Sequence, residues 1–250
     1  MSLAKAIAAL DSTVSIFQGS GTNKIPDVVL FNYVIDVQEQ SRAVQAVVQA
    51  GVPRAAFVNA RAAMESALDA SYLVADPAEY RARGARARVV EMFEQERLSR
   101  RADLEKTVLP GASEAMEAAI KSDAALWEQD SRGARALLLS TFEHFCKHPP
   151  GIGDHWSGLN RIELYRSLAG TKEEKDEMAK MLDVVYGHLS LHAHPKPRTS
   201  QRVASLDPDG TLVIAGREND EEHAVNATVL AIQLMIAAVE RRKAMTQEVA

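Results

Sequence analysis

Apolar residues recur along most of the chain with the three-to-four-residue spacing of an α-helix, and short segments rich in Gly, Pro and Asn interrupt the pattern. The best-defined helix begins at Thr171, which forms a capping box with Glu174. Its apolar residues fall on one face: Met178, Met181, Leu182, Val185 and Leu189. The helices predicted from the whole pattern cover residues 3–17, 26–51, 53–75, 76–107, 113–128, 134–147, 159–168, 171–194 and 222–247.

The spacing becomes that of β-structure in one place, before the last helix. Residues 203–206 and 211–215 flank Asp207-Pro208-Asp209-Gly210, a sequence typical of a hairpin turn. The predicted fold class is therefore all-α, a bundle of about seven to eight helices with one small β-hairpin at residues 202–215, before the C-terminal helix.

Length and composition are those of an ordinary globular protein, with 250 residues, 46% apolar and 25% charged. The chain has neither an internal repeat nor a low-complexity linker, so we expect one helical domain. It would consist of an N-terminal helix and loop at residues 1–25 and a core at 26–250. The net charge of −5 argues against a generic nucleic-acid binder, which usually carries a basic face. RNA is therefore a partner that the charge does not favour, although a local basic patch would be compatible with it.

Several features favour a cytoplasmic location. Cys146 is the only cysteine, which excludes an intramolecular disulfide, so nothing indicates an oxidising compartment. The N-terminus lacks a secretory pattern, because Asp11 interrupts the apolar stretch that follows Lys5. The best membrane candidate, residues 227–239, contains Gln233 and is shorter than the roughly 20 residues of a membrane span. We expect it to be a buried core helix and expect no membrane partner.

Histidines are concentrated in one part of the chain. Six of the seven lie between residues 144 and 194, and two pairs have a spacing of four, which places both imidazoles of a pair on one helix face. Such pairs, with a carboxylate from Glu65 or Asp69, suit a zinc or iron site. The alternative is a set of core-edge and surface histidines, since no H-E-x-x-H motif is present. The ligands of the metal hypothesis are His144, His148, His188 and His192.

Two helices carry polar residues at intervals of four. Arg61, Glu65 and Asp69 lie on a helix otherwise rich in apolar residues. They indicate either a solvated face with intrahelical ion pairs or inward-facing charges, which must be paired and often mark functional sites. The second helix and the segment upstream of it offer residue types that could complete a polar pocket with an aromatic wall: Tyr186, Ser190, His194, Trp156 and Arg161.

The same residues carry a resemblance to a family of bacterial helical proteins of unknown function. The matching motifs are Arg61-x3-Glu65, the run Trp156-Ser157-Gly158-Leu159-Asn160-Arg161, and Tyr186-x2-Leu189-Ser190-x3-His194-Pro195, followed by a hairpin and a final helix. The resemblance covers residues 30–245. It implies an all-α core and no established activity. It also implies that one site is shared by Arg61, Glu65, Trp156, Arg161, Tyr186, Ser190 and His194.

The architecture of that family is also similar to the HEPN ribonucleases, helical proteins that use an Arg-x4–6-His motif. In such chemistry a histidine acts on the ribose 2′-hydroxyl, and an arginine stabilises the phosphorane charge. Here no arginine stands at the required distance before His194, so Arg61 or Arg161 would have to take its place in space. The run from Arg217 to His223 fits the spacing, but its four acidic residues would repel phosphate.

A cluster of four arginines at residues 81, 83, 86 and 88 offers a further contact surface for nucleic acid or an acidic partner. Glutamates follow at residues 91, 94 and 96, so we expect a solvated helix face instead.

Three functions remain open. The first is an enzyme or ligand-binding protein that uses the polar pocket, with His194 as acid or base and the arginines as anion or transition-state stabilisers; RNA cleavage is one form of it. The second is a metal-binding protein with a divalent ion at the histidine pairs; otherwise we expect no cofactor. The third is a non-catalytic interaction module, for example a homo-oligomer that associates through apolar helix faces.

Overall fold

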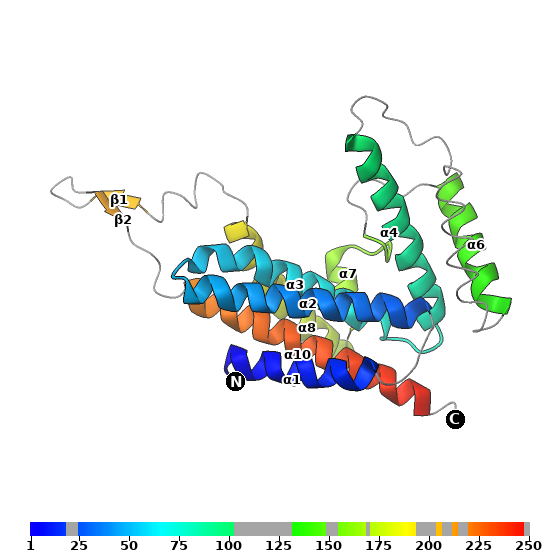
Figure 1. Cartoon of the computed structure of the whole chain (residues 1–250), viewed down its shortest axis with the longest axis horizontal. Helices are drawn as coiled ribbons and strands as arrows, with labels where there is room; N and C mark the ends of the chain where they lie inside the picture. The colour runs from blue at the N-terminus through cyan, green and yellow to red at the C-terminus, as the bar shows by residue number, and fades with distance from the viewer. Residues whose placement is uncertain are drawn as a thin grey trace. The chain divides into compact units, whose positions relative to one another are not determined.

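The structure is a computed structural model that describes residues 1–18, 25–102, 132–148, 155–168, 171–193, 204–206, 212–214 and 220–247. Figure 1 shows the eight helices of these residues: α1 (Leu3–Gln18), α2 (Ile25–Gln49), α3 (Pro53–Leu73), α4 (Tyr80–Ala102), α6 (Arg132–Lys147), α7 (Arg161–Arg166), α8 (Lys172–Ala193) and α10 (Asp220–Gln247). The predicted all-α class is confirmed. The helix predicted at residues 113–128 lies outside the described residues.

Two short strands precede α10. The strands β1 (Ala204–Leu206) and β2 (Leu212–Ile214) pair antiparallel, with Ser205 opposite Val213. The turn predicted at residues 207–210 lies outside the described part of the chain. The complete hairpin at residues 202–215 therefore stays a prediction.

The chain divides into two compact units. Unit 1 consists of Met1–Ser20, Asn32–Val74 and Tyr165–Ala250, and unit 2 consists of Gly21–Phe31 and Ala75–Leu164. Helices α2 and α7 each contribute residues to both units. The single domain expected over the whole chain stays a prediction.

The core of unit 1 is formed mainly by α3 and α10. Helix α10 packs along α3 and α1, and α3 also packs along α8 (Figure 1). The buried faces of α3 and α10 are rich in alanine, and small side chains let two helices approach closely. Larger side chains fill the remaining space: Phe57 and Met64 from α3, and Ile232 and Met235 from α10, all fully buried. The predicted burial of the C-terminal helix is therefore confirmed.

The apolar part of α10 is longer than we expected. Among the described residues, the segment Glu221–Met245 is long and apolar enough to cross a membrane, judged by length and composition alone. Half of its most apolar stretch is buried inside the structure, and the core helix of a globular protein passes the same test. The segment extends beyond residues 227–239 on the N-terminal side, where Ala224 and Val225 add apolar length, whereas four charged residues follow directly after Val239.

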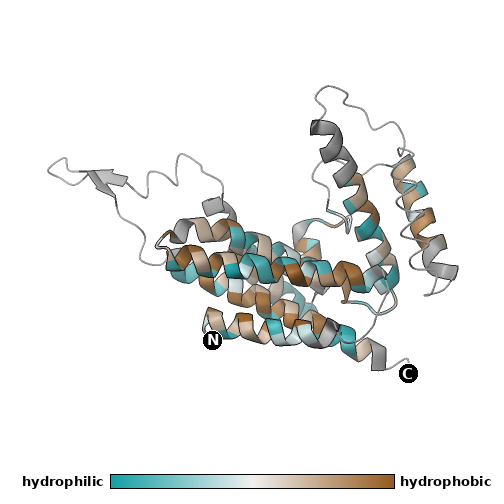
Figure 2. Ribbon diagram, in the orientation of Figure 1, coloured by the Kyte–Doolittle hydropathy of each residue, from teal (hydrophilic) through white to brown (hydrophobic). Residues whose placement is uncertain are grey.

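Polar contacts join the helices of unit 1 at their edges. Asp11 Oδ1 on α1 accepts hydrogen bonds from Gln38 Nε2 at 2.6 Å and from Arg42 Nη2 at 2.9 Å, both on α2. Ser66 Oγ on α3 donates to Asp36 Oδ2 on α2. Brown and teal residues mix along α2 in Figure 2, which reflects its buried and exposed faces. The ion pair of Arg42 with Asp11 is exposed and contributes little free energy, whereas Gln38 and Ser66 are buried and satisfy their polar groups between helices.

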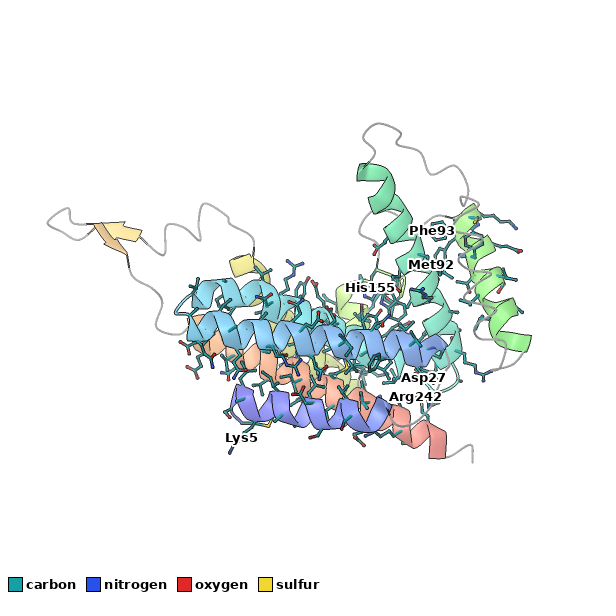
Figure 3. All side chains as sticks on the ribbon, in the orientation of Figure 1. Lys5, Asp27, Met92, Phe93, His155 and Arg242 are labelled. Atoms are coloured by element: carbon teal, nitrogen blue, oxygen red, sulfur yellow. The ribbon has the colours of Figure 1, made fainter. Side chains whose placement is uncertain are left out.

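Unit 2 is built around aromatic side chains. The ring of Phe93 on α4 lies 5.8 Å from that of Phe142 and 6.2 Å from that of Phe145, both on α6 (Phe93 is labelled in Figure 3). Such ring pairs contribute about 0.5–1.5 kcal/mol beyond the burial of their area. Leu138 on α6 and Val89 on α4 are also buried.

The predicted start of α4 was wrong. The helix begins at Tyr80 and not at Asp76, because Asp76 Oδ1 accepts the N–H of Ala78 at 2.9 Å and holds this segment in a turn. The helix also runs through Gly84 without a break. A Cβ at Gly84 would lie 2.5 Å from Cβ and 2.7 Å from Cα of Pro26, so this glycine lets α4 pass the start of α2.

Helix α8 begins as predicted. Glu174 Oε2 accepts the Thr171 N–H at 2.8 Å, and Thr171 Oγ1 accepts the Glu174 N–H at 3.2 Å, which confirms the capping box. Its apolar face was predicted only in part. Leu182 and Leu189 are buried, whereas Met181 is 41% exposed. The buried stripe is narrower than the apolar face, because one side of the helix packs against the rest of unit 1.

Candidate functional site

Arg61 and Glu65 lie one turn apart on α3 and form an ion pair. Arg61 Nε donates to Glu65 Oε1 at 2.9 Å. The side chain of Arg61 is 24% exposed and that of Glu65 is 47% exposed. The pair therefore lies on a side of α3 that solvent reaches. The structure thus combines the two alternatives that we considered, since the pair is intrahelical and partly exposed, and Arg61 is partly enclosed.

Tyr186 on α8 completes a three-membered cluster. Its hydroxyl donates to Glu65 Oε1 and accepts a hydrogen bond from Arg61 Nη2 at 2.8 Å. The Arg61 guanidinium carbon lies 5.0 Å from the centre of the Tyr186 ring, within the range of a cation–π contact. We call Arg61, Glu65 and Tyr186 the α3–α8 cluster. Each member contacts the other two, although 121 residues separate Glu65 from Tyr186.

The surroundings hold this cluster in defined charge states. Burial raises the pKa of Tyr186, the hydrogen bond to Glu65 and its negative charge raise it further, and Arg61 opposes the change only in part. Burial by itself lowers the pKa of Arg61, but Glu65 and Tyr186 outweigh it and the pKa is raised. At neutral pH the guanidinium of Arg61 is therefore cationic and the phenol of Tyr186 is neutral. The ion pair of Arg61 with Glu65 carries no net charge.

Within the described part of the chain, the other four residues of the predicted pocket are not seen at the α3–α8 cluster. Ser190 follows Tyr186 by one turn of α8, but its side chain is outside the description, and so is His194. Trp156 belongs to unit 2, where it is buried and its ring lies 5.5 Å from that of His155. Arg161 begins α7, and its side chain is not described. The shared site of seven residues stays a prediction. The structure brings three of the seven together, namely Arg61, Glu65 and Tyr186.

Sequence reasoning missed a second polar cluster, in unit 2. Arg86 Nη1 on α4 donates to the carbonyl oxygen of Ser157 at 3.1 Å, and its guanidinium carbon lies 5.9 Å from the centre of the Phe145 ring. The hydroxyl of Ser157 is 2.5 Å from His155 Nδ1 and accepts the Leu159 N–H at 3.1 Å. The expectation of a fully solvated arginine face on α4 was therefore wrong for Arg86. The available signal in the sequence was the glycine of the Trp-Ser-Gly motif. Gly158 adopts a φ of +73°, a conformation that glycine favours and that marks a turn next to Ser157.

The predicted metal ligands fall into two groups. His144 and His148 lie on and just after α6 in unit 2, and His188 and His192 lie on α8 in unit 1, where their side chains are not described. Within the described ranges, no three His, Cys, Asp or Glu side chains gather in a way that could hold an ion. Glu65, one of the expected carboxylate ligands, is bound to Arg61 and Tyr186.

The fold and this cluster define an all-α protein with a polar site between two helices of unit 1. The family model described as a family of unknown function (DUF5677) matches residues 27–211. The chain belongs to this family. Comparison with curated proteins and with solved structures found no match. Helices α1 and α10 lie outside the matched residues.

Proposed function

We propose that this protein binds a small polar ligand at the α3–α8 cluster. The observation that carries the proposal is the closed set of hydrogen bonds among Arg61, Glu65 and Tyr186, on a part of α3 that solvent reaches. The pKa values of Arg61 and Tyr186 are both raised in this cluster, and groups with perturbed pKa values often gather at functional sites. The two helices hold the three groups in place before a ligand arrives, which reduces the entropic cost of binding.

The charge balance of the cluster indicates the chemistry of the ligand. Arg61 is neutralised by Glu65, so a phosphate group would meet no net positive charge and would lie close to a carboxylate. The side chain of Glu65 is more exposed than that of Arg61, and its carboxylate accepts hydrogen bonds. A neutral or cationic ligand with hydroxyl or amine donors suits this arrangement better than an RNA phosphodiester does.

The proposal also includes Ser190 and His194, which follow Tyr186 along the chain. We propose that the ligand extends toward them, with His194 as the acid or base if the protein is an enzyme. RNA cleavage, a cytoplasmic location and a homo-oligomeric state stay predictions from the sequence.

A thermal-shift screen of the full chain tests the proposal. The probes are nucleosides, free amino acids and polyamines, which cover neutral and cationic donor-bearing ligands. A probe present at 100 times its Kd should raise Tm by about 5–10 °C, since binding then stabilises the fold by about 2.7 kcal/mol. The substitution Glu65→Gln keeps the shape of the side chain and removes its charge, and should abolish the shift.

Glu91→Gln is the matched control. Arg88 and Glu91 form another ion pair of 2.9 Å, with side chains 26% and 42% exposed, which is close to the values for Arg61 and Glu65. This control variant should keep the full ligand-induced shift. The proposal is rejected if none of the probes shifts the wild-type protein, or if Glu65→Gln and Glu91→Gln respond alike.

A further inference from the structure

The last turn of α6 presents two imidazole rings side by side. His144 and His148 are both exposed, and their ring centres are 5.2 Å apart. His148 follows the last residue of α6, yet its N–H donates to the carbonyl oxygen of His144 at 2.9 Å. This helical hydrogen bond places His148 one turn above His144. The backbone therefore holds the two residues one turn apart on the same side of α6, which brings their rings within reach of each other.

Neither ring is engaged elsewhere within the described residues. The ring of His144 has one further contact, edge-on to Phe145 at 5.4 Å, and neither imidazole forms a hydrogen bond to another described residue. A neutral imidazole offers one nitrogen lone pair to a metal ion, at about 2.0–2.1 Å for zinc. Small rotations of the two rings let both lone pairs point at one ion.

The position at the end of the helix adds to the attraction for a cation. The last carbonyl groups of a helix have no intrahelical partner, and the helix dipole places partial negative charge there. Lys147 and Glu143 are both exposed and oppose each other in charge. The helix end therefore contributes partial negative charge close to the two rings.

We propose that His144 and His148 together hold one divalent transition-metal ion of the Zn²⁺ or Ni²⁺ class. Imidazole ligands suit both ions. Two protein ligands leave coordination positions for water or for a donor from another molecule, so the ion exchanges freely with solvent. The ion bridges the last turn of α6 and reduces fraying of that turn. This site lies in unit 2 and does not depend on the ligand proposed for the α3–α8 cluster.

The test is calorimetric titration of the full chain, without a histidine tag, with ZnCl₂ and NiCl₂. We expect one ion per chain at this site, with the affinity lost in His144→Ala and equally in His148→Ala. Hydrogen exchange adds a second readout, because bound Zn²⁺ should slow exchange of the amides at residues 144–148. Both histidines are exposed, so circular dichroism should show unchanged helix content in the variants.

Controls separate this pair from other donors. The double variant Glu143→His, His148→Ala keeps seven histidines but places the second ring at an adjacent position, where two side chains do not face each other. It should bind as weakly as His148→Ala. Cys146→Ser and His223→Ala should bind like the wild type. The proposal is overturned if the wild type binds neither ion, if the double variant keeps the affinity, or if His188→Ala removes it while His144→Ala does not.

Discussion

Units 1 and 2 are both helical but are stabilised in different ways. Unit 1 has helix faces rich in alanine, on which α3 and α10 lie close together with a few large side chains between them. Unit 2 relies on aromatic rings around Phe93 and on specific polar contacts such as that of Arg86 with the Ser157 carbonyl. Packing of small residues distributes stability over a long interface, whereas unit 2 depends more on single contacts.

This difference also affects where chemistry can be located. In unit 1, the extensive core leaves the α3–α8 cluster as a polar site at the edge of a rigid scaffold, which suits ligand binding. In unit 2, Arg86 binds the backbone of Ser157, whereas His144 and His148 lie exposed at the end of α6. The two proposed sites follow this division.

The largest effect is expected from removal of α10. Ending the chain before Asp220 removes Ile232, Met235 and Val239 from the core, and each large apolar side chain contributes about 1.5–3 kcal/mol when buried. The buried face of α3 would also become exposed, and together these losses match the about 5–15 kcal/mol that stabilise a typical domain. We expect unit 1 not to fold, measured as loss of cooperative unfolding and of amide protection in α3.

Ending the chain after Gln247 is the control and should leave stability unchanged. The same argument applies to the family-matched fragment of residues 27–211, which lacks both α1 and α10. A fragment that unfolds cooperatively with wild-type protection in α3 would contradict our account of the core of unit 1.

A pair of glycine substitutions tests the dependence of unit 2 on single contacts. Gly84→Ala forces a Cβ against the Pro26 backbone, which cannot rotate away, and we expect a loss of about 1–3 kcal/mol in the free energy of unfolding. Gly187→Ala on α8 is the matched control, because a Cβ there meets no described atom within 4 Å. Alanine should stabilise that helix by up to about 1 kcal/mol. Urea unfolding measures the change in the free energy of unfolding for both variants. If Gly84→Ala stabilised the protein as Gly187→Ala does, the close approach at Gly84 would be refuted.

The smallest expected effect is that of Tyr186→Phe, and it depends on pH. Near neutral pH the variant should lose about 0.5–1.5 kcal/mol, because the hydroxyl bonds with both Arg61 and Glu65. The pKa of Tyr186 is raised above its ordinary value of 10.0, so the folded protein retains a proton that the unfolded chain releases. The wild-type advantage is therefore complete below that value and declines as the pH rises above it.

Urea unfolding of both proteins across this alkaline range measures the decline. The stability difference between wild type and Tyr186→Phe should be constant at neutral pH and should narrow only once tyrosine titrates. A difference that does not change with pH would show that the hydroxyl of Tyr186 does not have the environment described above.

The sequence predicted much of the helical fold because helix starts and stops are local. The capping box at Thr171 and Glu174 formed as expected, since its four atoms lie within one turn of the chain. The failures came where another part of the chain intervenes. Glycine weakens an isolated helix, yet α4 runs through Gly84, where the absence of a Cβ lets Pro26 approach. Met181 belongs to the apolar face by spacing, yet the packing of α8 leaves it partly exposed.

For the candidate site, the sequence supplied the residue types and their spacing along each helix. Arg61 with Glu65 could be identified as a pair because residues four apart share a helix face. That Tyr186 joins them depends on how α8 packs against α3, and no local rule relates positions 121 residues apart. Arg86 was missed for the same reason, because its partner Ser157 is 71 residues away.

What the sequence by itself determined is the all-α class, most helix boundaries and the one-turn spacing of the pairs Arg61/Glu65 and His144/His148. These follow from backbone geometry and short-range hydrogen bonding, which need only neighbouring residues. Only the tertiary structure decided that Tyr186 meets the first pair and that Arg86 binds the Ser157 backbone. Long-range contacts depend on which apolar faces pack together, and many pairings of such faces bury similar area, so side-chain fit selects among them.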